Sequence, residues 1–290
     1  MSVAVETIEP AVVVGGALTA LFVPGDRPDR YAKAAASGAD VVIIDLEDAV
    51  APAAKYQARV AAVRALAPTS DAPLHALVRV NAVGTDTHDA EIGELLGLAG
   101  LTVHGLLGVV LPKAEDPAVV TDLAARFNGA GLAVVALIES AAGVLNAPAV
   151  ARVPGVTRLA LGAIDLTVDV GAELDSPVVA HASAQLVLAS RAARIAPPLD
   201  SPSIAINDTA AVQISARSAR ATGFGGKLCI HPAQLTAVRA AFLPSDEQIE
   251  WARTIIAAGD AAVQIDGQMI DKPVIDKARA ILRRAGQDAS

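Results

Sequence analysis

Eight short apolar segments recur along the chain, and each ends at or beside a charged or hydroxylated residue. They are LTALFVPG (18–25), VVIIDLED (41–48), LHALVRVN (74–81), GLLGVVLPK (105–113), LAVVALIES (132–140), TRLALGAIDL (157–166), PLDSPSI (198–204) and GGKLCIH (225–231). Ala-rich stretches long enough for a helix separate them. A strand followed by a helix, repeated eight times, predicts parallel strands closed into an α/β barrel. Because chemistry in such barrels gathers where the strands end, the residues that end these segments are site candidates.

The same pattern predicts the domain organisation. We expect one catalytic barrel over residues 17–265, a size common for this architecture, after a flexible leader at 1–16. Residues 266–290 are expected to form a C-terminal extension, made of a turn and a closing helix. Pro273 suits the first turn of that helix, where its missing N–H costs nothing.

Composition narrows the class of protein. The chain is 53% hydrophobic, which suits parallel strands buried on both faces. A net charge of −8 and 2% aromatic residues disfavour nucleic acid as a partner. No segment has the length and apolar character of a membrane span, and the residues before Pro10 lack the basic group of a secretory signal. The single cysteine, Cys229, fits a reducing cytoplasm and is interpreted as a buried hydrophobe.

The second and third segments bring two carboxylates and a cation to neighbouring strand ends. Asp45 and Glu47 alternate onto one face, and Arg79 interrupts a valine run where a charge is rarely buried unless paired. The planar guanidinium suits bidentate contact with a carboxylate or an enolate-like oxygen. A catalytic or substrate-anchoring Arg79 is the favoured reading. Solvated charge and a purely structural ion pair are the alternatives.

Glu139 and Asp165 end the fifth and sixth segments. Burial after a long apolar strand favours the protonated acids, whereas a divalent cation would keep both ionised. Two carboxylates with open positions for water and substrate oxygens match the usual Mg²⁺ site, and no His/Cys spacing suits zinc. Helix capping is the alternative role for each.

Three further polar residues are given smaller roles. Lys113 is a poor candidate for a Schiff-base lysine, because Glu139 and Asp165 nearby would raise its pKa. Asp200 and His231 are expected to be structural or to support the site indirectly.

Eight motifs in order resemble the HpcH/HpaI aldolase and citrate lyase beta-subunit-like family. They are LFVPGDRP, DLEDAVAPAAK, VRVN, GVVLPKAE, LIESAAGVLNA, LALGAIDL, LDSPS and GFGGKLCIHPAQL, from about Leu18 to Phe242, with a further piece at GQMIDKP. The resemblance implies a TIM barrel, Mg²⁺, and cleavage or formation of a carbon–carbon bond next to a carboxylate. The substrate of such relatives is typically a coenzyme A thioester.

By motif position, the resemblance implies roles for individual residues. Glu139 and Asp165 would be the metal ligands. Arg79 would polarise the reacting oxygen, with Glu47 and Asp45 holding it. A separate pair, Lys55 and Arg59, would contact the phosphates of coenzyme A from one helical face, where an exposed basic face is the alternative.

Asp271 lies in a Met-Ile-Asp-Lys-Pro pattern that resembles a motif of coenzyme A-using relatives. In several of them this motif belongs to a C-terminal lid that closes over a neighbouring subunit. There it would act as acid or base on the thioester, which implies a homotrimer or homohexamer. A helix N-cap is the alternative. The chain departs from the family at Ala17–Thr19, where relatives carry an Arg, and at His181–Ser183, where many have a Tyr-Ala-Arg-Ser stretch. These departures leave the anionic substrate open.

The expected function is a Mg²⁺-dependent lyase or thioesterase acting on a 3-hydroxyacyl-CoA such as malyl-CoA or citramalyl-CoA. One alternative is a metal-dependent aldolase that splits a free hydroxylated keto acid to pyruvate. The other is a citrate lyase beta subunit that works only on an acyl carrier protein.

Overall fold

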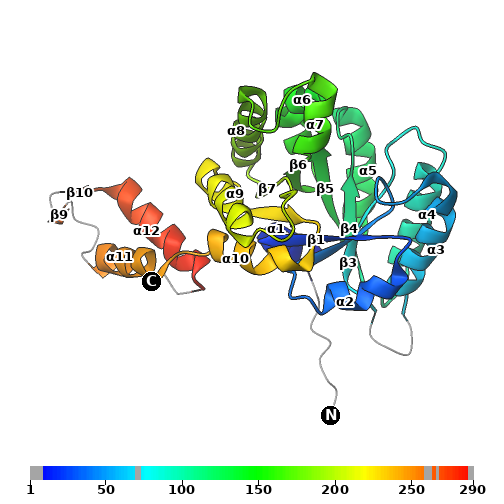
Figure 1. The fold of residues 1–290 in the computed structure, drawn as a ribbon, viewed down its shortest axis with the longest axis horizontal. Coiled ribbons are helices and arrows are strands. Elements are labelled where there is room, and N and C mark those ends of the chain that lie inside the picture. The colour runs from blue at the N-terminus through cyan, green and yellow to red at the C-terminus, as the bar shows by residue number, and fades with distance from the viewer. Residues whose placement is uncertain (1–8, 69–72, 258–262, 266–267, 287–290) are drawn as a thin grey trace, which may run out of the picture. The chain divides into compact units, whose positions relative to one another are not determined.

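Eight parallel strands close into a barrel in sequence order, with β8 pairing back to β1. The computed structural model describes residues 9–68, 73–257, 263–265 and 268–286. The barrel strands are β1 (Thr19–Pro24), β2 (Val41–Asp45), β3 (Ala76–Arg79), β4 (Leu106–Leu111), β5 (Ala133–Ile138), β6 (Val156–Leu161), β7 (Ala196–Asp200) and β8 (Gly226–Cys229). The predicted (β/α)8 barrel is therefore confirmed (Figure 1).

Helices alternate with these strands along the chain, and most of them cover the outside of the barrel. They are α1 (Pro10–Gly16), α2 (Tyr31–Ala35), α3 (Lys55–Leu66), α4 (His88–Ala99), α5 (Pro117–Gly129), α6 (Ala141–Ala151), α7 (Ala163–Val170), α8 (Pro177–Ala193), α9 (Thr209–Thr222) and α10 (Leu235–Phe242), with short 3₁₀ turns at Pro28–Arg30, Pro52–Ala54 and Pro232–Gln234. In Figure 1, α3 and α4 lie on one side of the barrel and α8 and α9 on the other.

Local sequence explains where several helices begin. The side chains of Asp116, Ser140, Ser176 and Asp208 each accept a hydrogen bond from a backbone N–H in the first turn of α5, α6, α8 and α9 respectively. Such caps satisfy donors that have no partner inside the helix. Strands such as β2, with its VVIID segment, are buried along their whole length, because one face meets the barrel interior and the other meets helices.

The N-terminal segment differs from the predicted flexible leader. Pro10–Gly16 is the helix α1, and Val14 is buried in the apolar core inside the barrel. The guanidinium of Arg158, on β6, donates to the carbonyls of Val14 and Ala17 at 3.1 and 2.7 Å. Residues 10–16 therefore close one end of the barrel. Residues 1–8 lie outside the described residues.

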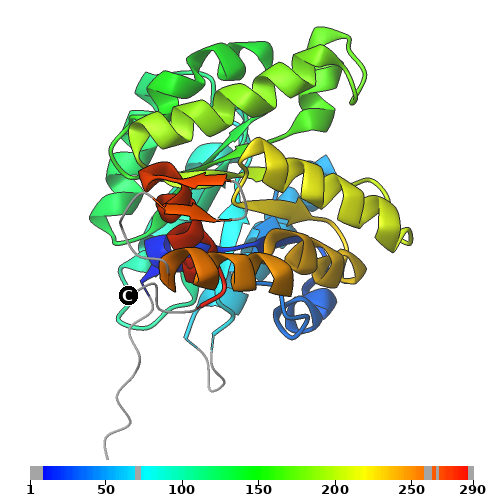
Figure 2. The ribbon, with the colours of Figure 1, turned by 90° about the vertical axis from the view of Figure 1, so that its left-hand side faces the viewer.

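The C-terminal residues form a second compact unit. The chain divides into residues 1–238 and 239–290, so the division precedes the predicted boundary at 266. Within the second unit, α11 (Asp246–Ala257) packs beside α12 (Lys272–Arg284) around the buried residues Ala252, Ile255, Ile275, Ala278 and Leu282 (Figure 2). β9 (Val263–Ile265) and β10 (Gln268–Ile270) form an antiparallel pair.

Within the described residues, no helix combines the length and the apolar composition needed to cross a membrane.

Candidate active site

Arg79 and Asp45 end adjacent strands and are register partners in the sheet. The Arg79 Nε donates to Asp45 Oδ1 at 2.7 Å, and Nη2 donates to Oδ2 at 2.6 Å. This is the bidentate fork that the planar guanidinium favours. Asp45 is almost fully buried, so the pair is screened little by solvent.

Glu47 is a second acidic side chain against Arg79. Its Oε2 lies 2.8 Å from Arg79 Nη1, and the Phe22 ring packs against the guanidinium at 4.8 Å. Burial raises the pKa of Glu47 to about 8, although the positive charge of Arg79 opposes the shift. Burial also disfavours the charge on Arg79, but the hydrogen bonds and charge of Asp45 outweigh it and raise the pKa of Arg79. Arg79 is thus a permanent cation.

Glu139 lies directly after β5 and is 1% exposed. It accepts a hydrogen bond from the Lys113 backbone N–H at 2.9 Å. A Cβ on Gly162 would lie 2.6 Å from Glu139 Cβ and 2.7 Å from Oε2, so only glycine leaves room for this carboxylate. Burial raises the pKa of Glu139 to about 7, so the free carboxyl is easily protonated.

Asp165 reaches the same region from a helix and not from a strand end. β6 ends at Leu161, and Asp165 lies in the first turn of α7. The Lys113 Nζ is 3.6 Å from Glu139 Oε1 and 3.7 Å from Asp165 Oδ1, so one ammonium pairs with both carboxylates. Burial disfavours the Lys113 charge, but these two acids outweigh that effect and raise its pKa, as the sequence predicted.

One cavity of about 450 Å³ collects these groups at the C-terminal end of the strands. Asp45 and Arg79 line it together with Glu139 and Asp165. Its remaining walls are largely apolar, and include Phe22, Leu137, Ile164, Leu228 and Ile230. The structure therefore brings the predicted cation and the predicted metal ligands to a single cavity.

The two acids fit a hard divalent cation. Ser140, and not Glu139, caps α6, so the capping alternative for Glu139 is excluded. In the part of the chain that is described, no three His, Cys, Asp or Glu side chains gather as a complete ligand set. Mg²⁺ needs no such set, since it keeps several waters and binds through one or two carboxylates and substrate oxygens. The Lys113 ammonium already shows that a positive charge is accommodated between Glu139 and Asp165.

Asp200, His231 and Cys229 lie outside this arrangement. Asp200 forms an ion pair with the buried Lys227 and lines a separate cavity of about 240 Å³. The His231 ring accepts a hydrogen bond from Ala233 N–H and caps the turn at Pro232–Gln234. Burial raises the pKa of Cys229 to about 12, which suits a packing residue and not a nucleophile.

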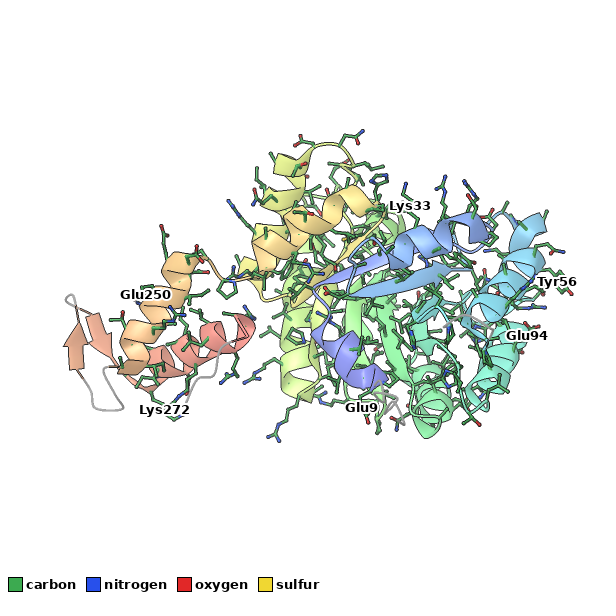
Figure 3. The ribbon with its side chains drawn as sticks, turned by 90° about the horizontal axis from the view of Figure 1, so that it is seen from below. Glu9, Lys33, Tyr56, Glu94, Glu250 and Lys272 are labelled. Carbon is green, nitrogen blue, oxygen red and sulfur yellow. The ribbon has the colours of Figure 1, made fainter. Side chains whose placement is uncertain are left out.

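Lys55 and Arg59 lie one turn apart on α3 and each has a protein partner. The Lys55 Nζ donates to the carbonyl of Leu46. The Arg59 Nε lies 3.1 Å from Glu94 Oε1, and its guanidinium lies 5.3 Å from the Tyr56 ring centroid. Figure 3 shows Tyr56 and Glu94 pointing outward from α3 and α4. Contact with coenzyme A stays a prediction for both basic residues.

Asp271 caps a helix in the second unit. Its side chain accepts a hydrogen bond from Val274 N–H at 3.3 Å at the start of α12, as the alternative reading expected. The lid role of Asp271 stays a prediction. Asp266 and Gly267, where the sequence predicts a turn, lie outside the described residues.

The sequence reasoning missed two buried polar residues beside the site. Asn81, which follows β3, is buried, and the sequence analysis assigns it no role. Glu91 is fully buried in α4. Glu91 has a recognisable signal, because it lies on the same helical face as the buried Leu95 and Leu98, four and seven residues later. An acid in an apolar stripe implies a specific buried partner.

Known proteins are similar to this chain over most of its length. A citrate lyase subunit beta-like protein of Mycobacterium tuberculosis is 40% identical over 281 residues, covering 93% of this chain and 96% of the relative. An L-malyl-CoA/beta-methylmalyl-CoA lyase of Cereibacter sphaeroides is 31% identical over 300 residues, covering 91% and 93%.

A solved structure is also similar to this chain over nearly its whole length. The CitE protein of Mycobacterium tuberculosis in complex with magnesium, acetoacetate and coenzyme A superposes with a TM-score of 0.80 at 38% identity, covering 94% of this chain and 99% of that one. The sequence model of the family described as HpcH/HpaI aldolase/citrate lyase matches residues 18–232. The chain therefore belongs to the HpcH/HpaI aldolase/citrate lyase family.

Proposed function

We propose that this protein is a Mg²⁺-dependent carbon–carbon lyase that acts on a 3-hydroxyacyl-CoA thioester such as malyl-CoA or citramalyl-CoA. One observation carries the proposal: a single cavity of about 450 Å³ is lined by the Arg79 guanidinium and by the carboxylates of Glu139 and Asp165. Cleavage next to a carboxylate needs a site for the acid half and a cation for the oxygen that gains charge.

Glu139 and Asp165 are the residues that would hold the metal. Bound Mg²⁺ supplies a Lewis acid and a template for the carboxylate and α-oxygen of a 2-keto or 2-hydroxy acid. The hydrogen bond from Lys113 N–H orients Glu139, and the absent side chain of Gly162 gives it space. Both features keep the buried carboxylate aimed in one direction.

Arg79 would stabilise the charge that develops on oxygen. A guanidinium has five N–H donors. Arg79 donates two hydrogen bonds to Asp45, and its Nη1 forms an ion pair with Glu47 Oε2 at 2.8 Å. The other donors are available to a ligand in the cavity that Arg79 lines. Because Asp45 and Glu47 already hold the guanidinium, its orientation need not be established during the reaction. The enolate of the acyl thioester is the species whose negative charge Arg79 would stabilise most.

The thioester half is assigned from the relatives. Lys55 and Arg59 are proposed to contact coenzyme A phosphates, and Asp271 is proposed to act as acid or base on the thioester from a neighbouring subunit of a homotrimer or homohexamer. Support comes from the coenzyme A complex of the Mycobacterium tuberculosis protein and from the malyl-CoA lyase of Cereibacter sphaeroides.

Turnover of a substrate panel tests the proposal. Purified protein with Mg²⁺ is offered malyl-CoA, citramalyl-CoA, free hydroxylated keto acids and acyl carrier protein thioesters. Cleavage of a coenzyme A thioester into a keto acid and a shorter acyl-CoA is the expected result. Hydrolysis to free coenzyme A without carbon–carbon cleavage would identify a thioesterase. Turnover of free keto-acid aldols alone, or of carrier-protein thioesters alone, would contradict the proposal.

Calorimetry tests the metal site separately. Binding of pyruvate or oxaloacetate is expected to require Mg²⁺ and to disappear in Glu139→Ala. The control is Asp122→Ala, which removes an exposed carboxylate on α5. Metal-dependent binding that survives in Glu139→Ala would overturn the ligand assignment.

A further inference from the structure

We propose that the half-buried Lys55 and the buried Asn81 and Glu91 form a hydrogen-bonded support that positions the end of β2, and with it Glu47, against Arg79. These three are positioning residues and do not touch the reacting atoms. The inference deepens the proposed function and rests on it, because Arg79 is the cation of that reaction.

The backbone after Asp45 is the target of the support. The Lys55 Nζ donates to the carbonyl of Leu46 at 2.7 Å and to the carbonyl of Glu47 at 2.5 Å. The Asn81 Nδ2 donates to the same Leu46 carbonyl at 2.9 Å. Two side chains from different elements thus converge on one carbonyl oxygen, which holds the segment between β2 and α3 in place.

Glu91 in turn fixes Asn81. Its Oε2 accepts from the Asn81 backbone N–H at 2.7 Å, and its Oε1 accepts from the Asn81 Nδ2 at 2.5 Å. Burial raises the pKa of Glu91, while these hydrogen bonds from Asn81 oppose the shift. Since both partners are donors, the geometry requires two acceptor oxygens, as an ionised carboxylate supplies.

The support connects to Arg79 through the backbone as well. Asn81 lies two residues after Arg79, and the Leu46 N–H donates to the Arg79 carbonyl at 2.9 Å. The Glu47 N–H donates to Asp45 Oδ1, the oxygen that also accepts from Arg79 Nε. The ends of β2 and β3 are therefore held together on both sides of the guanidinium. Loss of the support would move Glu47 while leaving its side chain chemically intact.

A matched pair of substitutions in α4 tests the inference. Glu91→Gln places an NH₂ group against a donor of Asn81, whereas Asp89→Asn removes the same charge from the same first turn at an exposed position. A misplacement of about 1 Å costs roughly 100-fold in rate. We expect Glu91→Gln to lower kcat about 10- to 100-fold with KM changed less than about 3-fold. Asp89→Asn should stay within about 2-fold of wild type.

Lys55→Met provides a second variant if Glu91→Gln fails to fold. Positioning predicts a lower kcat, whereas loss of a coenzyme A contact alone would raise KM at unchanged kcat and would overturn the role of Lys55 here. The double variant Lys55→Met/Glu91→Gln should fall by less than the product of the single effects, because both act on the Leu46 carbonyl. Multiplicative effects would contradict a shared support.

Crystal structures separate this inference from the proposed function. The Glu47 Oε2 to Arg79 Nη1 distance of 2.8 Å should be lost in Glu91→Gln and kept in Asp89→Asn. An unchanged distance overturns the positioning role, whatever the activity. If wild type cleaves no thioester, the proposed function fails, and the same distance still decides whether the support exists. If Glu91→Gln has a lowered melting temperature but a normal kcat at temperatures where it is folded, Glu91 has a purely structural role.

Discussion

Arg79 and Asp45 are joined by two parallel hydrogen bonds of 2.7 and 2.6 Å between the ends of adjacent strands. Glu47 holds the remaining side of the guanidinium, so the cation has one orientation towards the cavity. Two acidic side chains placed in this way hold a flexible side chain as a rigid donor.

Arg79→Lys should lower kcat/KM by about 100- to 1,000-fold, although the charge is kept. An ammonium lacks the planar fork, so it cannot bind both oxygens of Asp45 and donate to a ligand in the same geometry. Steady-state kinetics on a cleaved thioester would measure the loss. Arg126→Lys, at an exposed position of α5, is the control. Near-normal activity in Arg79→Lys would show that only the charge matters.

Gly162→Ala should abolish or strongly weaken Mg²⁺ binding. Its Cβ would lie 2.6 Å from Glu139 Cβ and 2.7 Å from Oε2, and the buried carboxylate has to move. Gly97→Ala, in α4, has open space at its Cβ and should raise stability by about 0.5–1 kcal/mol. Calorimetric titration with Mg²⁺, together with thermal unfolding, checks both. Unchanged metal affinity in Gly162→Ala would mean that Glu139 is not a ligand.

Lys113→Met should bind Mg²⁺ more tightly than wild type, by about 3- to 10-fold. The Lys113 Nζ lies 3.6 and 3.7 Å from the two carboxylates, so it competes with a bound cation for their charge. The backbone N–H that orients Glu139 remains in the variant. Titration in the absence of substrate isolates this effect. Weaker binding would instead assign Lys113 to the support of the metal site.

Glu47 should make the free energy of unfolding fall as pH rises. Burial raises its pKa from 4.5 to about 8, so between these values the folded chain keeps a proton that the unfolded chain has released. The folded state binds more protons there, and its stability declines with pH. The wild-type stability minus that of Glu47→Gln should therefore decrease from pH 5 to about 8.5. Urea unfolding across this range measures the difference.

The same urea series includes a control. Glu173→Gln, at an exposed position, should reproduce the pH dependence of wild type. A difference between wild type and Glu47→Gln that is flat or rises with pH would show that Glu47 stays ionised in the folded protein.

Arg158→Met should destabilise the barrel by about 3 kcal/mol or more. The fully buried guanidinium donates to the carbonyls of Val14, Ala17 and Pro197, and all three would lose a donor. The exposed Arg152→Met is the matched control. Thermal unfolding is the measurement, and equal melting temperatures for both variants would contradict the role of Arg158 in holding α1.

The sequence by itself determined the barrel and the kinds of side chain at the C-terminal ends of its strands. Eight apolar segments of the kind that parallel strands covered on both faces require have few alternatives to a closed parallel barrel. Because strand ends meet at one face, Arg79, Asp45 and Glu139 were expected together, and they line one cavity. These predictions depend on period and position along the chain, which local sequence carries.

The remaining features depend on contacts between residues far apart in the sequence. Pro10–Gly16 is short and apolar, and only the interior of the barrel and the guanidinium of Arg158, more than 140 residues away, give it a place. The sequence shows Glu91 as an acid within an apolar helical stripe. That Asn81 is its hydrogen-bond partner depends on the packing of α4 against the strand ends. A buried polar group is stabilised only by a partner that folding brings to it, so its role is decided by the tertiary structure.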